Sequence, residues 1–294
     1  MKAKLAVIAA LVVFLIIGCG KKHNGANQSE SFIQVKGSDT VVNAAQKVAE
    51  EFMKEYPHVF VAITGGGSGV GIASLINKTC DVATASREIK PKEMELAEKQ
   101  GVYPKEFVVA HDGVAVIVNK NNPVSHLTIE DLHRIFTGKA DNWKQFGGED
   151  LAIVTLSREV SSGTYAYFKE QVIHLGNNQS TEEFSPGTLL LSSSQAIVEE
   201  AATNEAAVGY LGMGYLCQRI KTLSLGANGL FYPPDVNNVL KGTYPLSRPL
   251  YFYTDGEPRD ATKLFIDFTL SVKGQQQFEE TGFVPLGAAF PEKN

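Results

Sequence analysis

Apolar residues follow two alternating patterns along this chain, beginning at Phe32. Short apolar runs rich in β-branched residues predict buried strands at 32–35, 59–63, 81–85 and 152–156. Between strands, apolar residues recur at helical spacing, as in the set Val41, Ala45, Val48, Ala49 and Phe52. This alternation predicts an α/β protein with a largely parallel sheet. In such sheets, ligands bind where the carboxyl ends of strands meet the starts of helices.

The alternation continues less regularly through the rest of the chain. Two strands are expected at 107–110 and 114–118, separated by the polar segment His111-Asp112-Gly113, and others at 207–211 and 250–253. Further helices are expected up to Lys99, at 129–136, at 196–202, around 264–268 and up to Gly282. Residues 226–248 are rich in proline, glycine and asparagine, which predicts loops.

The turn after the strand at 152–156 carries the strongest chemical signal. It runs from Arg158 through Ser161, Ser162, Gly163 and Thr164 into a segment with helical spacing. A helix that starts here directs unpaired N–H groups and a partial positive charge at the turn. The arginine adds a permanently charged planar fork, and the hydroxyls add donors. The segment predicts a socket for a small anion, and an ordinary helix cap is the alternative.

The glycine-rich segment Gly65–Gly71 fits none of the familiar motifs. It lacks the third glycine of a dinucleotide loop and the Lys-Ser/Thr pair of a Walker A loop, and Val70 replaces a glycine of the nucleophile elbow. The segment is better described as a flexible loop that presents Ser68 at a helix start, which suits phosphate-like anions. A glycine-rich hairpin or linker is the alternative.

The N-terminus has the features of a secretory signal. Lys2 and Lys4 precede the apolar run Leu5–Ile17, which is too short for a comfortable membrane span. The run ends at Gly18-Cys19 and resembles the bacterial lipobox, which implies cleavage before Cys19 and lipid attachment to it. Residues 1–18 would then be a signal peptide and residues 19–31 a flexible polar tether. A signal peptide with a chance cysteine, or an uncleaved anchor, remains the alternative.

Charge and histidine placement exclude some functions. The formal net charge of −5 argues against nucleic acid as a partner. None of the six histidines has the spacing of a catalytic triad or a metal site. A resident metal is therefore not expected, and an exported hydrolase that uses Ser68 or Ser162 is the least favoured function.

Several short segments occur in the same order and spacing in one protein family. These segments are 37–40, 67–69, 85–87, 112–116, 136–139, 142–143, Arg158 with 162–164, 208–210, 244–248, 265–268 and 274–275. Each is weak alone, but together they are specific and span the chain from Gly37 to Leu286. On these residues the chain resembles the phosphate-binding lipoproteins of bacterial phosphate ABC transporters, the PstS-like members of the periplasmic-binding-protein superfamily.

The resemblance implies the two-lobed α/β fold of type II periplasmic binding proteins. Two crossing hinge strands would join the lobes, and the ligand would lie in the cleft between them. Lobe one would comprise residues 32–112 plus 247–294, and lobe two residues 113–246, with crossings near 111–115 and 247–250. This division separates Cys80 from Cys217. We therefore expect two buried free thiols, although a disulfide is also open to an exported protein.

Carried over residue by residue, the family's ligand contacts come from both lobes. Lobe one would contribute Thr40, with Ser38 as a further candidate, and Ser68. Lobe two would contribute the remaining contacts, which are Arg158, Ser162, Gly163 and Thr164. An anion contacted by both lobes favours the closed hinge state, which a transporter can recognise.

One position departs from part of the family. There, an aspartate after the Ala-Ser of the third turn accepts the proton of hydrogen phosphate and so excludes sulfate. This chain has Arg87 after Ser86. If phosphate selectivity is kept, we expect Asp112 or Asp39 to supply the acceptor. The alternative is that Asp39 caps its helix and Asp112 pairs with Arg87.

The resemblance thus implies a monomeric, extracytoplasmic lipoprotein anchored to the cell envelope through Cys19. It would capture inorganic phosphate and deliver it to an ABC permease for import, without catalysis, cofactor or metal. The same fold holding sulfate, molybdate or tungstate is the main alternative, and a sensing role in place of import is left open.

Overall fold

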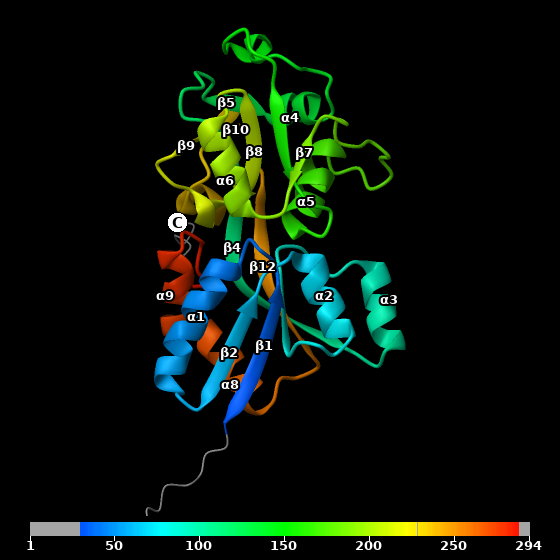
Figure 1. The fold of residues 1–294 in the computed structure, drawn as a ribbon, viewed down its shortest axis with the longest axis vertical. Coiled ribbons are helices and arrows are strands. Elements are labelled where there is room, and N and C mark those ends of the chain that lie inside the picture. The colour runs from blue at the N-terminus through cyan, green and yellow to red at the C-terminus, as the bar shows by residue number, and fades with distance from the viewer. Residues whose placement is uncertain (1–29, 228, 288–294) are drawn as a thin grey trace, which may run out of the picture.

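The computed structural model describes residues 30–227 and 229–287, which form two α/β lobes stacked end to end (Figure 1). The predicted signal peptide and Cys19 lie outside the described residues. Within the described residues, every helix is too short or too polar to cross a bilayer.

The lower lobe in Figure 1 is built on three parallel strands in the order β2–β1–β3. Helices α1, α2 and α3 each follow one of these strands, and α8 and α9 pack beside α1. The elements are β1 (Ser31–Gly37), α1 (Val42–Glu55), β2 (Val59–Thr64), α2 (Ser68–Ile76), β3 (Val82–Ala85), α3 (Pro91–Lys99), α8 (Asp260–Leu270) and α9 (Val272–Glu280). The apolar face that predicted α1 is buried, so the expected strand–turn–helix repeat is confirmed here.

The upper lobe contains the parallel strands β7–β6–β8 and a small sheet in the order β11–β10–β5. Its elements are β5 (His126–Thr128), α4 (Ile129–Phe136), η1 (Trp143–Phe146), β6 (Val154–Arg158), α5 (Gly163–Phe168), the π-helical η2 (Lys169–Ile173), β7 (Leu189–Leu191), α6 (Ser194–Thr203), β8 (Ala207–Gly212), η3 (Met213–Tyr215), β9 (Ile220–Thr222), β10 (Ser224–Ala227), β11 (Leu230–Tyr232) and α7 (Val236–Leu240). The expectation of loops alone across 226–248 was wrong, because β11 and α7 form there.

Two strands, β4 (Pro104–Asn119) and β12 (Ser247–Asp255), run antiparallel from one lobe into the other (Figure 1). β4 pairs with β12 as far as Gly113 and with β8 from Val114 onward. The prediction of two strands broken at 111–113 was wrong, because β12 pairs with these polar residues and keeps them extended. The sheet is also mixed rather than largely parallel, since β12 and β4 are antiparallel to their neighbours.

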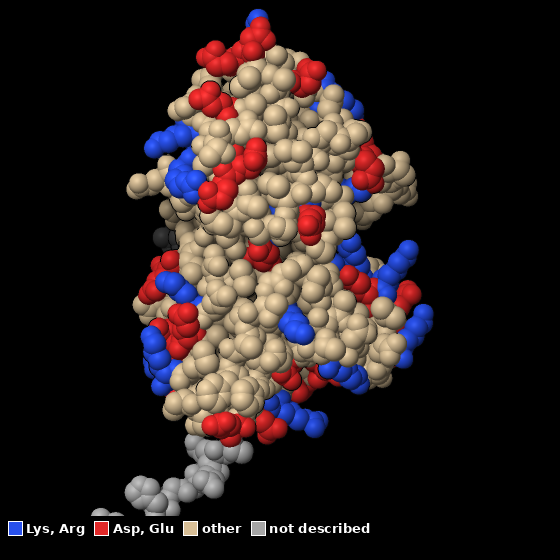
Figure 2. Space-filling model, in the orientation of Figure 1, with Lys and Arg blue, Asp and Glu red and all other residues tan. Residues whose placement is uncertain are grey.

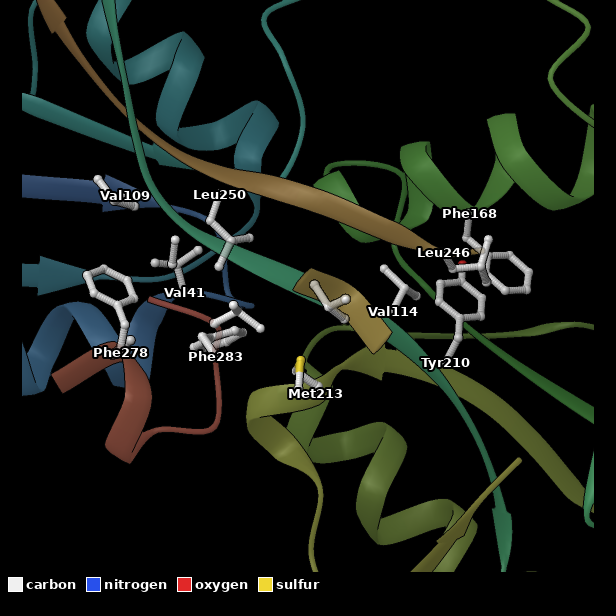
Figure 3. Packing of buried hydrophobic residues seen from close by; sticks show 14 of the residues in the cluster. Val41, Val109, Val114, Phe168, Tyr210, Met213, Leu246, Leu250, Phe278 and Phe283 are labelled. Atoms are coloured by element: carbon white, nitrogen blue, oxygen red, sulfur yellow. The ribbon is translucent and has the colours of Figure 1, made fainter. Parts of the chain in front are cut away.

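The largest of three apolar clusters in the described residues follows the crossing strands through both lobes (Figure 3). It runs from Val41 and Phe278 past Leu250 and Val114 to Tyr210. At its upper end, the rings of Phe168 and Tyr210 stack with centroids 3.7 Å apart. Close packing of this kind stabilises the contact between α5 and β8 in the upper lobe.

Acidic and basic side chains are interspersed over the face shown in Figure 2. No large area of a single sign is visible on this face. Attraction of an anion from this side would therefore depend on local groups rather than on a broad positive field.

The two cysteines in the described residues, Cys80 and Cys217, are both free thiols. Cys80 is buried and Cys217 is exposed, so the expectation of two buried thiols is wrong for Cys217. Burial raises the pKa of the Cys80 thiol to about 12. We expect an alkylating reagent at pH 8 to modify Cys217 in the native protein and Cys80 only after unfolding. Peptide mass spectrometry would measure this, and equal native labelling of both thiols would contradict it.

Candidate anion-binding site

The anion socket predicted in lobe two begins where β6 ends. Arg158 is the last residue of β6, and Ser162 is the N-cap of α5. The Ser162 hydroxyl accepts from the backbone N–H groups of Thr164 and Tyr165, at 3.2 and 3.3 Å. This is the local cap that the Ser-Gly-Thr sequence predicted. The Ser162 O–H keeps its own proton for donation to another acceptor.

Three serine hydroxyls from lobe one meet on the other side of the interlobe contact. Ser38, Ser68 and Ser86 lie at the turns after β1, β2 and β3, and all three are buried. The Ser38 hydroxyl donates to Ser86 Oγ at 3.1 Å, and the backbone N–H of Ser86 donates to Ser68 Oγ at 3.0 Å. The carboxyl ends of parallel strands place these turns together.

The two sets of groups meet directly between the lobes. The hydroxyls of Thr40 and Thr164 are 2.7 Å apart, and the backbone N–H of Gly69 donates to the carbonyl of Ser161 at 2.9 Å. A Cβ added to Gly163 would overlap Ser68 Oγ and lie 2.5 Å from Ser86 Oγ. Only glycine allows the turn of lobe two to approach the hydroxyls of lobe one this closely.

Arg158 joins the lobes through Asp39. Its guanidinium is almost fully buried and lies 3.0 Å from Asp39 Oδ2, which also accepts from the backbone N–H of Ser194 at 2.7 Å. The same guanidinium donates to the Ser194 hydroxyl and the Ser192 carbonyl. Burial lowers the pKa of Arg158, and Asp39 opposes that shift. Asp39 therefore does not cap α1, whose N-cap residue is Val41 and has no side-chain cap bond.

A second buried ion pair lies on the crossing strands. Asp112 Oδ2 accepts from Arg248 Nε at 3.0 Å and Nη2 at 2.8 Å, and its Oδ1 accepts from the backbone N–H of Met213 at 3.0 Å. Burial raises the pKa of the Asp112 carboxyl, and Arg248 opposes that shift. The alternative pairing of Asp112 with Arg87 was wrong, because Arg87 forms two hydrogen bonds to Glu93 on α3.

Sequence reasoning missed Arg248 and Ser194 as parts of this site. Arg248 lies in segment 244–248, and the match of this segment to the family is the signal that could have identified it. Ser194 begins α6 after an irregular stretch that gave no strand or helix pattern at 189–191, where β7 forms. Its position beside Arg158 depends on strand order in the folded sheet.

The serines of the site lack the surroundings of a nucleophile. In the described residues, hydroxyl contacts of Ser68 involve Ser86, and those of Ser162 involve the α5 backbone. The described histidines that form side-chain hydrogen bonds contact groups elsewhere, such as Val172 and Glu182. The arrangement is suited to binding, because hydroxyls, N–H groups and guanidinium groups surround one point between the lobes.

A groove of about 990 Å³ lies beside this region, and the proposed ligand residues at 38, 40, 68, 158 and 162–164 do not line it. Ser86 and Arg248 lie along it, together with Lys90, Tyr165 and Tyr167.

Comparison with known proteins decides the family. The model of the periplasmic-binding-protein (PBP) superfamily domain matches residues 22–273. The phosphate-binding protein PstS of Pseudomonas aeruginosa is 32% identical over 276 residues, covering 87% of this chain and 84% of that protein. PstS of Staphylococcus saprophyticus is 32% identical over 291 residues, covering 96% of this chain and 88% of that protein. The chain belongs to the PstS-like phosphate-binding proteins.

Solved structures agree with this assignment. A substrate-binding protein from Clostridium perfringens, assigned to a phosphate ABC transporter and containing bound phosphate, has a TM-score of 0.79. It is 31% identical, and the match covers 87% of this chain and 100% of that one. An ABC-type phosphate transport receptor from Vibrio cholerae has a TM-score of 0.68 at 31% identity, and the match covers 86% of this chain and 99% of that one. The predicted two-lobed fold is confirmed, and the family is one of extracytoplasmic solute-binding proteins that serve transport.

Proposed function

We propose that this protein captures inorganic phosphate between its lobes and delivers it to an ABC permease for import. One observation carries the proposal. Hydroxyl-bearing turns from both lobes converge at the Thr40–Thr164 contact, beside Arg158. The proposed ligand groups are those of Ser38, Thr40, Ser68, Arg158, Ser162, Gly163 and Thr164.

The geometry supports binding coupled to closure. Lobe one contributes hydroxyls at the ends of β1, β2 and β3, and lobe two contributes the start of α5. An anion that accepts from both sets stabilises the arrangement in which Gly163 lies against Ser68. A permease that recognises this closed form would distinguish loaded from empty protein.

Selectivity for phosphate requires an acceptor for its proton, and we propose Asp39. Its contacts with Arg158 and Ser194 both use Oδ2, which leaves Oδ1 available to a ligand at the neighbouring Thr40. Asp112 is a weaker candidate, because Arg248 and Met213 occupy both of its oxygens. Sulfate, molybdate and tungstate bring no proton and would meet the Asp39 carboxylate unpaired.

The remaining proposals concern the whole chain. We propose lobe boundaries at 32–112 plus 247–294 and at 113–246, close to where β4 exchanges β12 for β8. We further propose that residues 1–18 are removed, that Cys19 carries the lipid anchor, that residues 19–31 form a tether and that the protein acts as a monomer. The absence of a base at Ser68 and Ser162 within the described contacts favours binding over ester hydrolysis.

Calorimetric titration of the delipidated protein with phosphate, sulfate and arsenate tests the function. We expect one phosphate per chain and sulfate binding weaker by about 100-fold, since an unpaired buried charge costs about 1–3 kcal/mol or more. Arsenate also carries a proton and should compete with phosphate. Equal affinity for sulfate would favour the alternative of a general oxyanion receptor, and turnover of a phosphate ester would favour the alternative of an exported hydrolase.

A further inference from the structure

Arg248 lies on a crossing strand, and its side chain forms hydrogen bonds to both sides of the site. It lies on β12 opposite Asp112 of β4 and is 3% exposed. Its guanidinium donates to the Ser86 carbonyl at 3.0 Å and to the Thr164 hydroxyl at 3.0 Å. Ser86 follows β3 in lobe one, and Thr164 is in the first turn of α5 in lobe two.

The contact with Thr164 determines what its hydroxyl can do. A threonine hydroxyl has one proton and two lone pairs. Arg248 Nη2 donates to Thr164 Oγ1, so the proton of Thr164 must point to a different acceptor. In the described residues, the other side-chain hydrogen-bond partner of Thr164 Oγ1 is the Thr40 hydroxyl in the opposite lobe, 2.7 Å away. Arg248 thus occupies one lone pair of Thr164 Oγ1 and leaves its O–H free to point toward Thr40, where the two lobes meet.

The surroundings of Arg248 fix its direction. Asp112 accepts two of its N–H groups through a single oxygen, Oδ2. The guanidinium carbon lies 5.3 Å from the centre of the Tyr167 ring, and the Tyr167 hydroxyl donates to the carbonyl of Ser247 beside it. A planar fork held at several points in this way loses little freedom when an anion binds.

We propose that Arg248 is a positioning residue of the anion site, which orients the Thr164 hydroxyl as a donor to the bound anion. Asp112 balances the charge of Arg248, so the ion pair orients a hydrogen-bond donor without adding net positive charge to the site. The inference rests on the proposed phosphate-binding function and adds a residue to it. Because a donor serves phosphate and sulfate alike, Arg248 should affect affinity for both anions and leave their ratio unchanged.

A double-mutant cycle on the full delipidated protein tests this role. Arg248→Lys keeps the charge but loses the planar fork that reaches Asp112, Ser86 and Thr164 together. Thr164→Val keeps the shape of the side chain and removes the hydroxyl. Arg219→Lys, at an exposed pair with Glu199, is the matched control. Phosphate and sulfate dissociation constants come from calorimetry, and urea unfolding reports stability.

We expect Arg248→Lys to weaken phosphate binding about tenfold or more in the unaltered background. In the Thr164→Val background, Arg248→Lys should raise the phosphate dissociation constant by less than about threefold, because the hydroxyl that Arg248 orients is absent. An equal loss in both backgrounds, a changed phosphate-to-sulfate ratio, or no loss at all would overturn the role. If Arg248→Lys does not fold, Arg248→Gln with Asp112→Asn keeps a neutral hydrogen-bonded pair for the same cycle.

The cycle separates this inference from the function on which it rests. Failure of the unaltered protein to bind phosphate would end both. Phosphate binding by the unaltered protein, with no coupling between Arg248 and Thr164, would end this inference alone.

Discussion

Replacing Gly163 with alanine is expected to weaken phosphate binding about 10- to 100-fold. The added methyl group would overlap Ser68 Oγ and lie 2.5 Å from Ser86 Oγ, both of which belong to the opposite lobe. Overpacking of this kind costs about 1–3 kcal/mol, which corresponds to that range of affinity. The cost falls on the closed form, because separation of the lobes removes the overlap.

Stability should therefore change far less than affinity in the Gly163→Ala protein. Gly163 is the first residue of α5 and does not have a positive φ, so alanine fits its backbone. Gly187→Ala is the matched control, since its added Cβ would meet only Ser185 Oγ at 4.0 Å. Calorimetry and urea unfolding measure the two quantities. Unchanged affinity, or an equal loss in the control, would show that close approach at Gly163 is not required for binding.

Local sequence signals predicted the elements and the turns of this fold well. Ser162 caps α5, as its position before Gly163 indicated, and the hydroxyls after β1, β2 and β3 lie together. These features depend on a few neighbouring residues and on the direction of parallel strands. Groups that are placed by one turn and the helix that follows it can therefore be predicted from the sequence.

Features that depend on strand pairing were missed or wrong. Polar residues interrupted the apolar pattern of β4 at His111 and Asp112, yet β12 pairs there and continues the strand. The same pairing places Arg248 opposite Asp112, 136 residues away in sequence. No periodic pattern identifies which buried arginine meets which buried aspartate, so the partners of Asp39, Arg87 and Asp112 are visible only in the folded protein.

The ion pairs explain how the site can hold an anion without a large positive charge. Arg158 is paired with Asp39, and Arg248 is paired with Asp112. Each guanidinium is fixed and nearly neutralised, so recognition depends on the direction of hydrogen bonds more than on total charge. A site of this kind can distinguish anions by whether they carry a proton, because one unmatched group leaves a buried charge without a partner.

Replacing Asp39 with asparagine is expected to reduce the preference for phosphate over sulfate by about 10- to 100-fold. A carboxylate at Asp39 accepts the phosphate proton, whereas the amide of asparagine can donate to sulfate. The change also removes the partner of the buried Arg158, which lies 3.0 Å from Asp39 Oδ2. Phosphate should therefore bind more weakly and sulfate more tightly. The two dissociation constants, measured by calorimetry, give the ratio.

Asp112→Asn is the comparison that makes the test specific. It removes a buried carboxylate of the same kind, but both oxygens of Asp112 accept from protein groups, namely Arg248 and Met213. We expect Asp112→Asn to lower the stability of the protein and to weaken the binding of both anions, because Arg248 would lose its charged partner. Its phosphate-to-sulfate ratio should stay near that of the unaltered protein. If the ratio falls for Asp112→Asn and not for Asp39→Asn, the acceptor is Asp112, and if it falls for neither, the proton is recognised by a different group.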